Sequence, residues 1–165
     1  ARELMRIFAC ALGLDRHHFD AMVDAHFATV PANFYPEPEG DPLPGQLRAG
    51  EHTDFGSLTI LAMNDAPGGL QVKMADGTWR DVHAQRGQFI VNLGDMMQRW
   101  TNDRWKSTLH RVVNPPAAAR SRSRRMTIGF FLHPNYDAEI ACLPGCCDAA
   151  HPARYEPIQI GRAHV

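Results

Sequence analysis

The chain has 165 residues, and its 17 lysines and arginines nearly balance its 18 aspartates and glutamates, which leaves a formal charge of -1. With 44% hydrophobic residues and 13 glycines, the composition is typical of a globular domain and excludes a disordered or fibrous chain. No apolar run approaches the roughly 20 residues of a spanning helix, and the balanced charge offers no global field for nucleic acid or an anionic membrane.

The first 30 residues are predicted to be a helical segment. Apolar side chains recur at helical spacing over residues 4–12, and a second such pattern covers residues 19–27 after a break near Gly13. Because the chain opens inside the first pattern, we expect residues 1–30 to continue from a longer N-terminal region.

Residues 31–50 change character, because five prolines lie among them. Proline fits neither a helix interior nor a central strand, so this stretch is predicted to be a loop. From residue 57 onward, short apolar runs alternate with turn residues, which is the pattern of β-strands. The predicted strands are 57–63, 70–74, 79–82, 89–93, 109–113 and 126–132, and turns are predicted at 65–69, 76–77 and 94–95.

The order of these elements predicts a mainly β fold. Several short strands, with helices confined to the front of the chain, favour a β-sandwich or barrel over a parallel doubly wound sheet. We expect residues 31–158 to form this core. Residues 159–165 match the back-translation of a common sequencing adapter, so we expect a non-native tail there and assign no chemistry to His164.

A candidate metal site begins at Glu51-His52-Thr53-Asp54. On an extended segment, His52 and Asp54 project from the same face, about 6.6 Å apart along the strand, so that both can reach one ion. The pair alone is more typical of a surface turn than of a metal site, so a third ligand is needed. His110, in a later apolar strand, supplies a third ligand, and two histidines with one carboxylate form the facial triad of non-haem Fe(II) oxygenases.

A candidate anion site follows on the last predicted strand. Arg125 and Thr127 point to the same side of that strand, where a guanidinium fork and a hydroxyl could hold one carboxylate of a dicarboxylic acid. The neighbouring Arg120, Arg122 and Arg124 alternate with serines and are predicted to lie in a solvated loop.

Six motifs in chain order resemble the isopenicillin N synthase-like family of 2-oxoglutarate and Fe(II)-dependent oxygenases, over about residues 30 to 158. They are Asn33-Phe34-Tyr35-Pro36, His52-Thr53-Asp54, Gly69-Leu70-Gln71-Val72, Asn92-Leu93-Gly94-Asp95, His110-Arg111-Val112 and Arg125-Met126-Thr127. The resemblance implies a double-stranded β-helix, or jelly roll, with flanking helices.

Site roles follow from the same resemblance. It implies that His52, Asp54 and His110 are the iron ligands and the catalytic centre. It also implies that Arg125 and Thr127 hold the far carboxylate of 2-oxoglutarate, with polar contacts from Asn33 and Tyr35. Residues 115–123 form an inserted loop relative to the family, so Arg124 is the alternative anchor. The implied cofactors are Fe(II), 2-oxoglutarate as cosubstrate, and dioxygen.

The function implied is that of a dioxygenase, an oxidoreductase that hydroxylates or otherwise oxidises a small organic substrate and releases succinate and carbon dioxide. Two alternatives stay open: a non-haem iron oxidase of the same fold that does not consume 2-oxoglutarate, and a non-catalytic metal-containing jelly-roll binding module. The sequence names neither the substrate nor the oligomeric state.

The cysteines indicate the redox conditions in which the protein works. There are four of them: Cys10, Cys142, Cys146 and Cys147. They are too few and too clustered for a disulfide framework, and no secretory signal is visible. We therefore expect a cytoplasmic protein whose partner is a small-molecule substrate, with no nucleic acid and no membrane.

Overall fold

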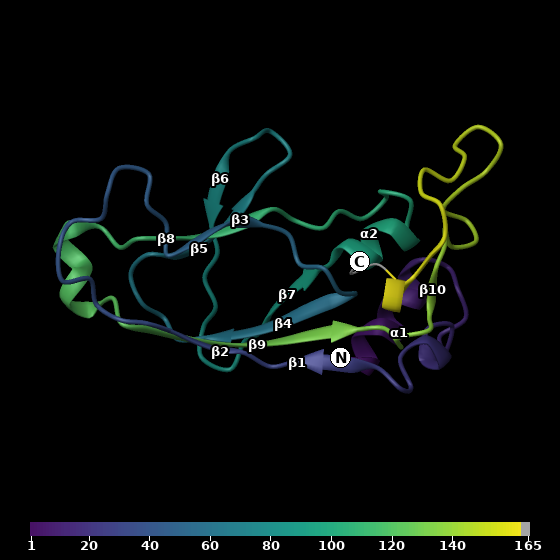
Figure 1. Ribbon diagram of the computed structural model, residues 1–165, viewed down its shortest axis with the longest axis horizontal. Helices are drawn as coiled ribbons and strands as arrows, with labels where there is room; N and C mark the ends of the chain where they lie inside the picture. The colour runs from purple at the N-terminus through teal and green to yellow at the C-terminus, as the bar shows by residue number, and fades with distance from the viewer. Residues whose placement is uncertain (163–165) are drawn as a thin grey trace.

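The computed structural model describes residues 1–162, and two antiparallel sheets facing each other make up most of it (Figure 1). The larger sheet has the order β1-β9-β4-β7, and β2 also pairs with β9. The smaller sheet has the order β3-β8-β5-β6. Two facing sheets with flanking helices match the predicted jelly roll.

The strands of the larger sheet are β1 (Phe27–Thr29), β2 (Ala32–Tyr35), β4 (Leu58–Met63), β7 (Ile90–Leu93) and β9 (Arg125–His133). Those of the smaller sheet are β3 (Ala49–His52), β5 (Gly69–Lys73), β6 (Trp79–Asp81) and β8 (His110–Val113). The other elements are α1 (Arg2–Ala11), α2 (Asp95–Trp100), the pair β10 (Glu139–Ile140) and β11 (Ile158–Gln159), and the 3-10 helices η1 (Asp20–Met22), η2 (Ala117–Arg122) and η3 (Ile160–Arg162).

The long strand β9 organises the larger sheet. It pairs with β4 on one side and with β1 and β2 in succession on the other. Burial alternates along the strand: Arg125, Thr127 and Gly129 are buried, whereas Met126 and Ile128 are exposed. Since side chains of a strand point to opposite faces in turn, the buried set faces the smaller sheet.

The hydrophobic core lies at one end of the two sheets. There, helices α1 and α2 pack beside the C-terminal end of β9, at the right of Figure 1. Met5, Phe19, Trp100 and Leu132 are almost completely buried in it. Because this core occupies only one end, the space between the sheets at the other end remains available for a cavity. Within residues 1–162, no helix has the length and hydrophobicity to cross a membrane.

All six predicted strands are confirmed, but the predicted helix over residues 19–27 is wrong. Only the single 3-10 turn η1 forms there, and β1 begins at Phe27. Phe27 pairs with His133 of β9, and their rings stack with centroids 4.6 Å apart. Pairing with β9 therefore overrides a helical pattern that only local spacing supports.

Three further expectations need correction. The loop predicted over residues 31–50 contains the edge strand β2. Pro31 and Pro36 lie on either side of this strand and not within it, so its own four residues keep the N–H groups that pairing with β9 requires. Helices are not confined to the front, since α2 begins at Asp95, inside the turn predicted at 94–95. The inserted loop at 115–123 contains η2.

The division at residues 30 and 158 stays a prediction. Residues 163–165 of the expected tail, His164 included, lie outside the residues that the structure describes.

Candidate active site

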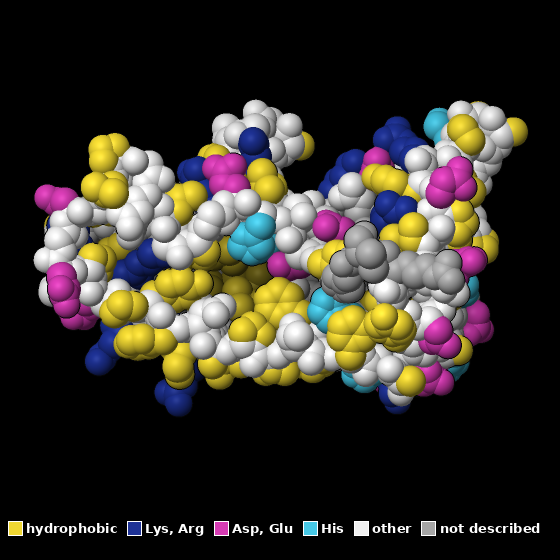
Figure 2. Space-filling view, in the orientation of Figure 1, with side chains coloured by type: hydrophobic (Ala, Val, Ile, Leu, Met, Phe, Trp, Pro, Cys, Tyr) yellow, Lys and Arg dark blue, Asp and Glu magenta, His cyan; other side chains and the backbone are white. Residues whose placement is uncertain are grey.

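A large cavity of about 1050 Å³ opens between the two sheets. Figure 2 shows the hollow near the middle of the molecule, with hydrophobic side chains in its depth and a histidine at its rim. Every residue that the sequence analysis placed in the site lines this cavity: His52, Asp54, His110, Arg125, Thr127, Asn33 and Tyr35. The volume is in the range of cavities that hold small molecules.

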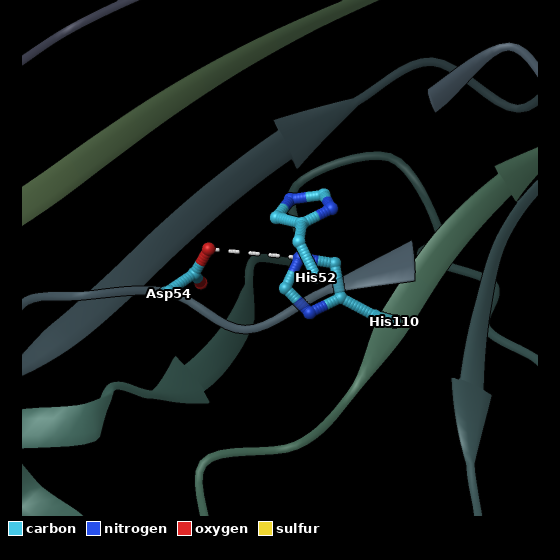
Figure 3. A group of neighbouring side chains, drawn as sticks. All are labelled: His52, Asp54 and His110. Atoms are coloured by element: carbon cyan, nitrogen blue, oxygen red, sulfur yellow. Dashed lines mark ion pairs between the residues drawn. The ribbon is translucent and has the colours of Figure 1, made fainter. Parts of the chain in front are cut away.

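The three predicted metal ligands converge on one wall of the cavity (Figure 3). His52 ends β3, His110 begins β8, and the two are directly paired in the smaller sheet, with ring centroids 4.3 Å apart. A register shift between Ala49 and His52 bends β3 just before the site, and Asp54 follows two residues later. One possible ligand atom from each of the three side chains lies within 4.8 Å of the others.

Backbone carbonyls orient both imidazoles. Nδ1 of His52 donates to the oxygen of Gly50 at 2.8 Å, and Nδ1 of His110 donates to that of Thr108 at 2.9 Å. Since a carbonyl oxygen can only accept, Nδ1 carries a proton in each ring, and in the neutral, metal-binding form of the imidazole the lone pair is on Nε2. Two such nitrogens and one carboxylate oxygen fit a divalent first-row metal.

The Asp54 carboxylate is 5% exposed and its two oxygens have different surroundings. Oδ1 lies 3.6 Å from Nε2 of His110. Oδ2 accepts hydrogen bonds from the Thr59 hydroxyl and the Asn92 amide. Sequence reasoning missed both donors, although Asn92 opens one of the motifs that carry the family resemblance.

Arg125 and Thr127 lie on the cavity side of β9, 3% and 7% exposed. The guanidinium of Arg125 donates to the Gly68 carbonyl at 3.1 Å and contacts the Met63 sulfur. Arg124 is exposed and does not line the cavity. Of the two arginines, the structure therefore brings only Arg125 into the cavity.

Arg125 is a buried cation that ion-pairs with no carboxylate among residues 1–162. Burial lowers the pKa of its guanidinium, and the charge of Arg48, which also lines the cavity, lowers it further. A buried charge without a counterion is costly, so this end of the cavity favours an anionic ligand.

Asn33 and Tyr35 belong to the same wall as the anion site. In the pairing of β2 with β9, Asn33 is opposite Thr127 and Tyr35 is opposite Arg125. Because directly paired residues project from the same face of a sheet, both side chains stand beside the residues that the sequence analysis assigned to the cosubstrate.

Gly69 leaves room for the Arg125 side chain, a role that sequence reasoning missed although this glycine opens one of the motifs that carry the family resemblance. A Cβ atom on Gly69 would lie 1.9 Å from Nη1 of Arg125, and the backbone there has a φ of +132°. Any side chain at this position must displace the guanidinium. The turn is thus a part of the arginine site.

Comparison with known proteins gives a consistent result. Residues 21–134 match the family model described as the 2OG-Fe(II) oxygenase superfamily. A 2-oxoglutarate-Fe(II) type oxidoreductase of Emericella nidulans, hxnY, is 38% identical over 162 residues, which cover 97% of this chain and 45% of that protein. Validamycin A dioxygenase of Streptomyces hygroscopicus subsp. limoneus is 34% identical over 87% of this chain and 40% of that protein.

Solved structures agree. The crystal structure of a full-length Neurospora crassa protein in complex with alpha-KG superposes with a TM-score of 0.90 at 40% identity, over 99% of this chain and 51% of that one. JOX2 in complex with 2OG, Fe and JA gives a TM-score of 0.84 at 31% identity, over 99% of this chain and 46% of that one. The chain therefore spans about half the length of the relatives it matches.

Proposed function

The chain belongs to the 2OG-Fe(II) oxygenase superfamily, and we propose that it is an Fe(II)- and 2-oxoglutarate-dependent dioxygenase that oxidises a small organic substrate. Succinate and carbon dioxide are the coproducts. The observation that carries the proposal is the convergence of His52, Asp54 and His110 on a cavity that also holds Arg125, a buried cation with no carboxylate partner in the described part of the chain.

Three protein donors leave three positions open on an octahedral ion. Nε2 of each histidine and Oδ1 of Asp54 would hold Fe(II), since the other ring nitrogens and the other carboxylate oxygen are already hydrogen-bonded. Together, Fe(II) and 2-oxoglutarate supply the electrons that activate dioxygen.

The remaining residues bind and orient the organic ligands. The fork of Arg125 and the hydroxyl of Thr127 hold the far carboxylate of 2-oxoglutarate, with Asn33 and Tyr35 as additional polar contacts. Apolar side chains such as Leu61 exclude water from the reacting centre. A cavity of about 1050 Å³ has space for 2-oxoglutarate and a small organic substrate together.

An iron oxidase of the same fold that does not consume 2-oxoglutarate is the alternative, and a non-catalytic binding module is a third. Arg125, which ion-pairs with no carboxylate within residues 1–162, favours the two enzymes over the binding module, because such a module needs no anion anchor beside the metal. An oxidase of this family can keep the same arginine, so succinate formation is what separates the two enzymes. We also propose a cytoplasmic location, since all four cysteines are free thiols, and a small-molecule rather than a nucleic-acid partner.

Anaerobic absorption spectroscopy tests the proposal. We expect Fe(II) to bind, and the addition of 2-oxoglutarate to produce the weak visible charge-transfer band of a chelated keto acid. With oxygen and a substrate, succinate should then form. Iron binding without the band would favour the oxidase or the binding module, and a failure to bind iron would contradict the assigned ligands.

Replacement of Gly69 with alanine should weaken 2-oxoglutarate binding by about 1 to 3 kcal/mol, because the new Cβ displaces the guanidinium of Arg125 and removes a charged hydrogen bond. Titration of the charge-transfer band measures this. Gly77→Ala is the matched control, since Gly77 also has a positive φ but open space around its Cβ position. Equal losses in the two variants would show that backbone strain, not contact with Arg125, is the cause.

A further inference from the structure

Two neutral donors from neighbouring strands hold one oxygen of Asp54. The Thr59 hydroxyl donates to Oδ2 at 2.6 Å, and the Asn92 amide donates to the same atom at 2.8 Å. Thr59 on β4 and Asn92 on β7 are directly paired in the larger sheet, so their side chains project together toward the carboxylate. Asp54 and Thr59 are both 5% exposed, which keeps water from competing for these bonds.

The backbone around Asp54 is also held by hydrogen bonds. The amide of Asp95 donates to the carbonyl of Asp54 at 2.7 Å, and the amide of Met96 donates to that of Gly56 at 3.2 Å. A Cβ atom on Gly94 would lie 2.0 Å from the Gly56 oxygen, so glycine is what allows this approach. With the backbone fixed, only rotation of the Asp54 side chain is left to be determined.

We propose that Thr59 and Asn92 are positioning residues that hold Oδ2 and thereby leave Oδ1 as the only metal-binding oxygen of Asp54. The inference rests on the proposed function and adds two residues to it. Both donors are neutral, so they orient the carboxylate without cancelling the charge that attracts the metal.

The number of coordination positions explains why this matters. If Asp54 bound through both oxygens, it and the two histidines would occupy four of the six positions of an octahedral ion. A keto acid that chelates through two atoms would then leave no position for dioxygen. With Oδ2 held by Thr59 and Asn92, one position would remain available for dioxygen beside a bound keto acid.

The test compares substitutions at adjacent positions of β4. Thr59→Val removes the hydroxyl and keeps the shape, Thr59→Ser keeps the hydroxyl, and Ile60→Val is a change of similar size at the next residue, which points to the other face. Asn92→Leu removes the second donor from the other strand. Each full-length variant is titrated anaerobically with Fe(II) alone, and then with 2-oxoglutarate at saturating Fe(II), while thermal unfolding of the metal-free protein monitors the fold.

We expect Thr59→Val and Asn92→Leu each to weaken Fe(II) binding by roughly 10- to 100-fold. Both variants should also bind 2-oxoglutarate more weakly at saturating metal. An Oδ2 atom that is no longer held by its hydrogen-bond donor would compete with the keto acid for a coordination position on the metal. In the double variant, the fold-loss of Fe(II) affinity should be smaller than the product of the fold-losses of the two single variants, since both donors act on one oxygen. Thr59→Ser and Ile60→Val should behave like the wild type.

The outcomes separate this inference from the function on which it rests. If the wild type binds no Fe(II), the proposed function fails. If the wild type binds Fe(II) and 2-oxoglutarate, and Thr59→Val and Asn92→Leu bind both equally well, only the positioning role is overturned. Equal losses for Thr59→Ser and Thr59→Val would also overturn it, because the hydroxyl would then not be the cause. If Thr59→Val does not fold, Asn92→Leu tests the same prediction from β7.

Discussion

Replacement of His52 with alanine is expected to abolish Fe(II) binding. The substitution leaves two of the three proposed ligands, whose possible ligand atoms lie within 4.8 Å of one another, and it would remove a bond to the metal itself. The loss should therefore exceed the roughly 10- to 100-fold that removal of an outer hydrogen-bond partner costs. His52 is exposed, and the only hydrogen bond of its ring within residues 1–162 is to the nearby Gly50 carbonyl, so the fold should survive.

Metal content after anaerobic loading, together with an Fe(II) titration, measures this effect. His83→Ala is the matched control, because His83 is an exposed histidine that does not line the cavity. Unchanged iron content in His52→Ala would show that the ligand set is wrong. A loss in both variants would show that iron binds at scattered surface histidines.

Replacement of Arg125 with alanine is expected to spare the iron and weaken 2-oxoglutarate binding by about 1.5 to 3 kcal/mol, the scale of a hydrogen bond to a charged group. That corresponds to roughly 10- to 150-fold in affinity. The effect should be specific, because Arg125 contacts none of the three metal ligands but lines the same cavity. Titration of the charge-transfer band with 2-oxoglutarate at saturating Fe(II) measures it.

The neighbouring residue provides the control for this experiment. Arg124→Ala removes an identical charge one position away, on the exposed side of the chain. It should leave the affinity for 2-oxoglutarate unchanged. If Arg124→Ala weakens binding and Arg125→Ala does not, the anchor is Arg124. If neither does, the cavity does not bind 2-oxoglutarate through this strand.

Errors in the predicted elements have a common cause. The apolar spacing over residues 19–27 fits a helix, but Phe27 belongs to β1 because it pairs with His133, which is far away in the chain. Likewise, the prolines around β2 are compatible with a strand only because β9 offers an edge beside it. Local patterns carry no information about such partners.

By itself, the sequence was sufficient for the strands from residue 57 onward and for the residue types of the site, because alternation, turn residues and short motifs are local signals. Tertiary structure decided the rest. Only the pairing of β3 with β8 sets His52 opposite His110. Only burial in the cavity distinguishes Arg125, the first residue of β9, from the exposed Arg124 just before the strand. The close approach of Gly69 to Arg125 and the hydrogen bond from Asn92 to Asp54 join residues that are far apart in the chain, so no spacing rule could have predicted them.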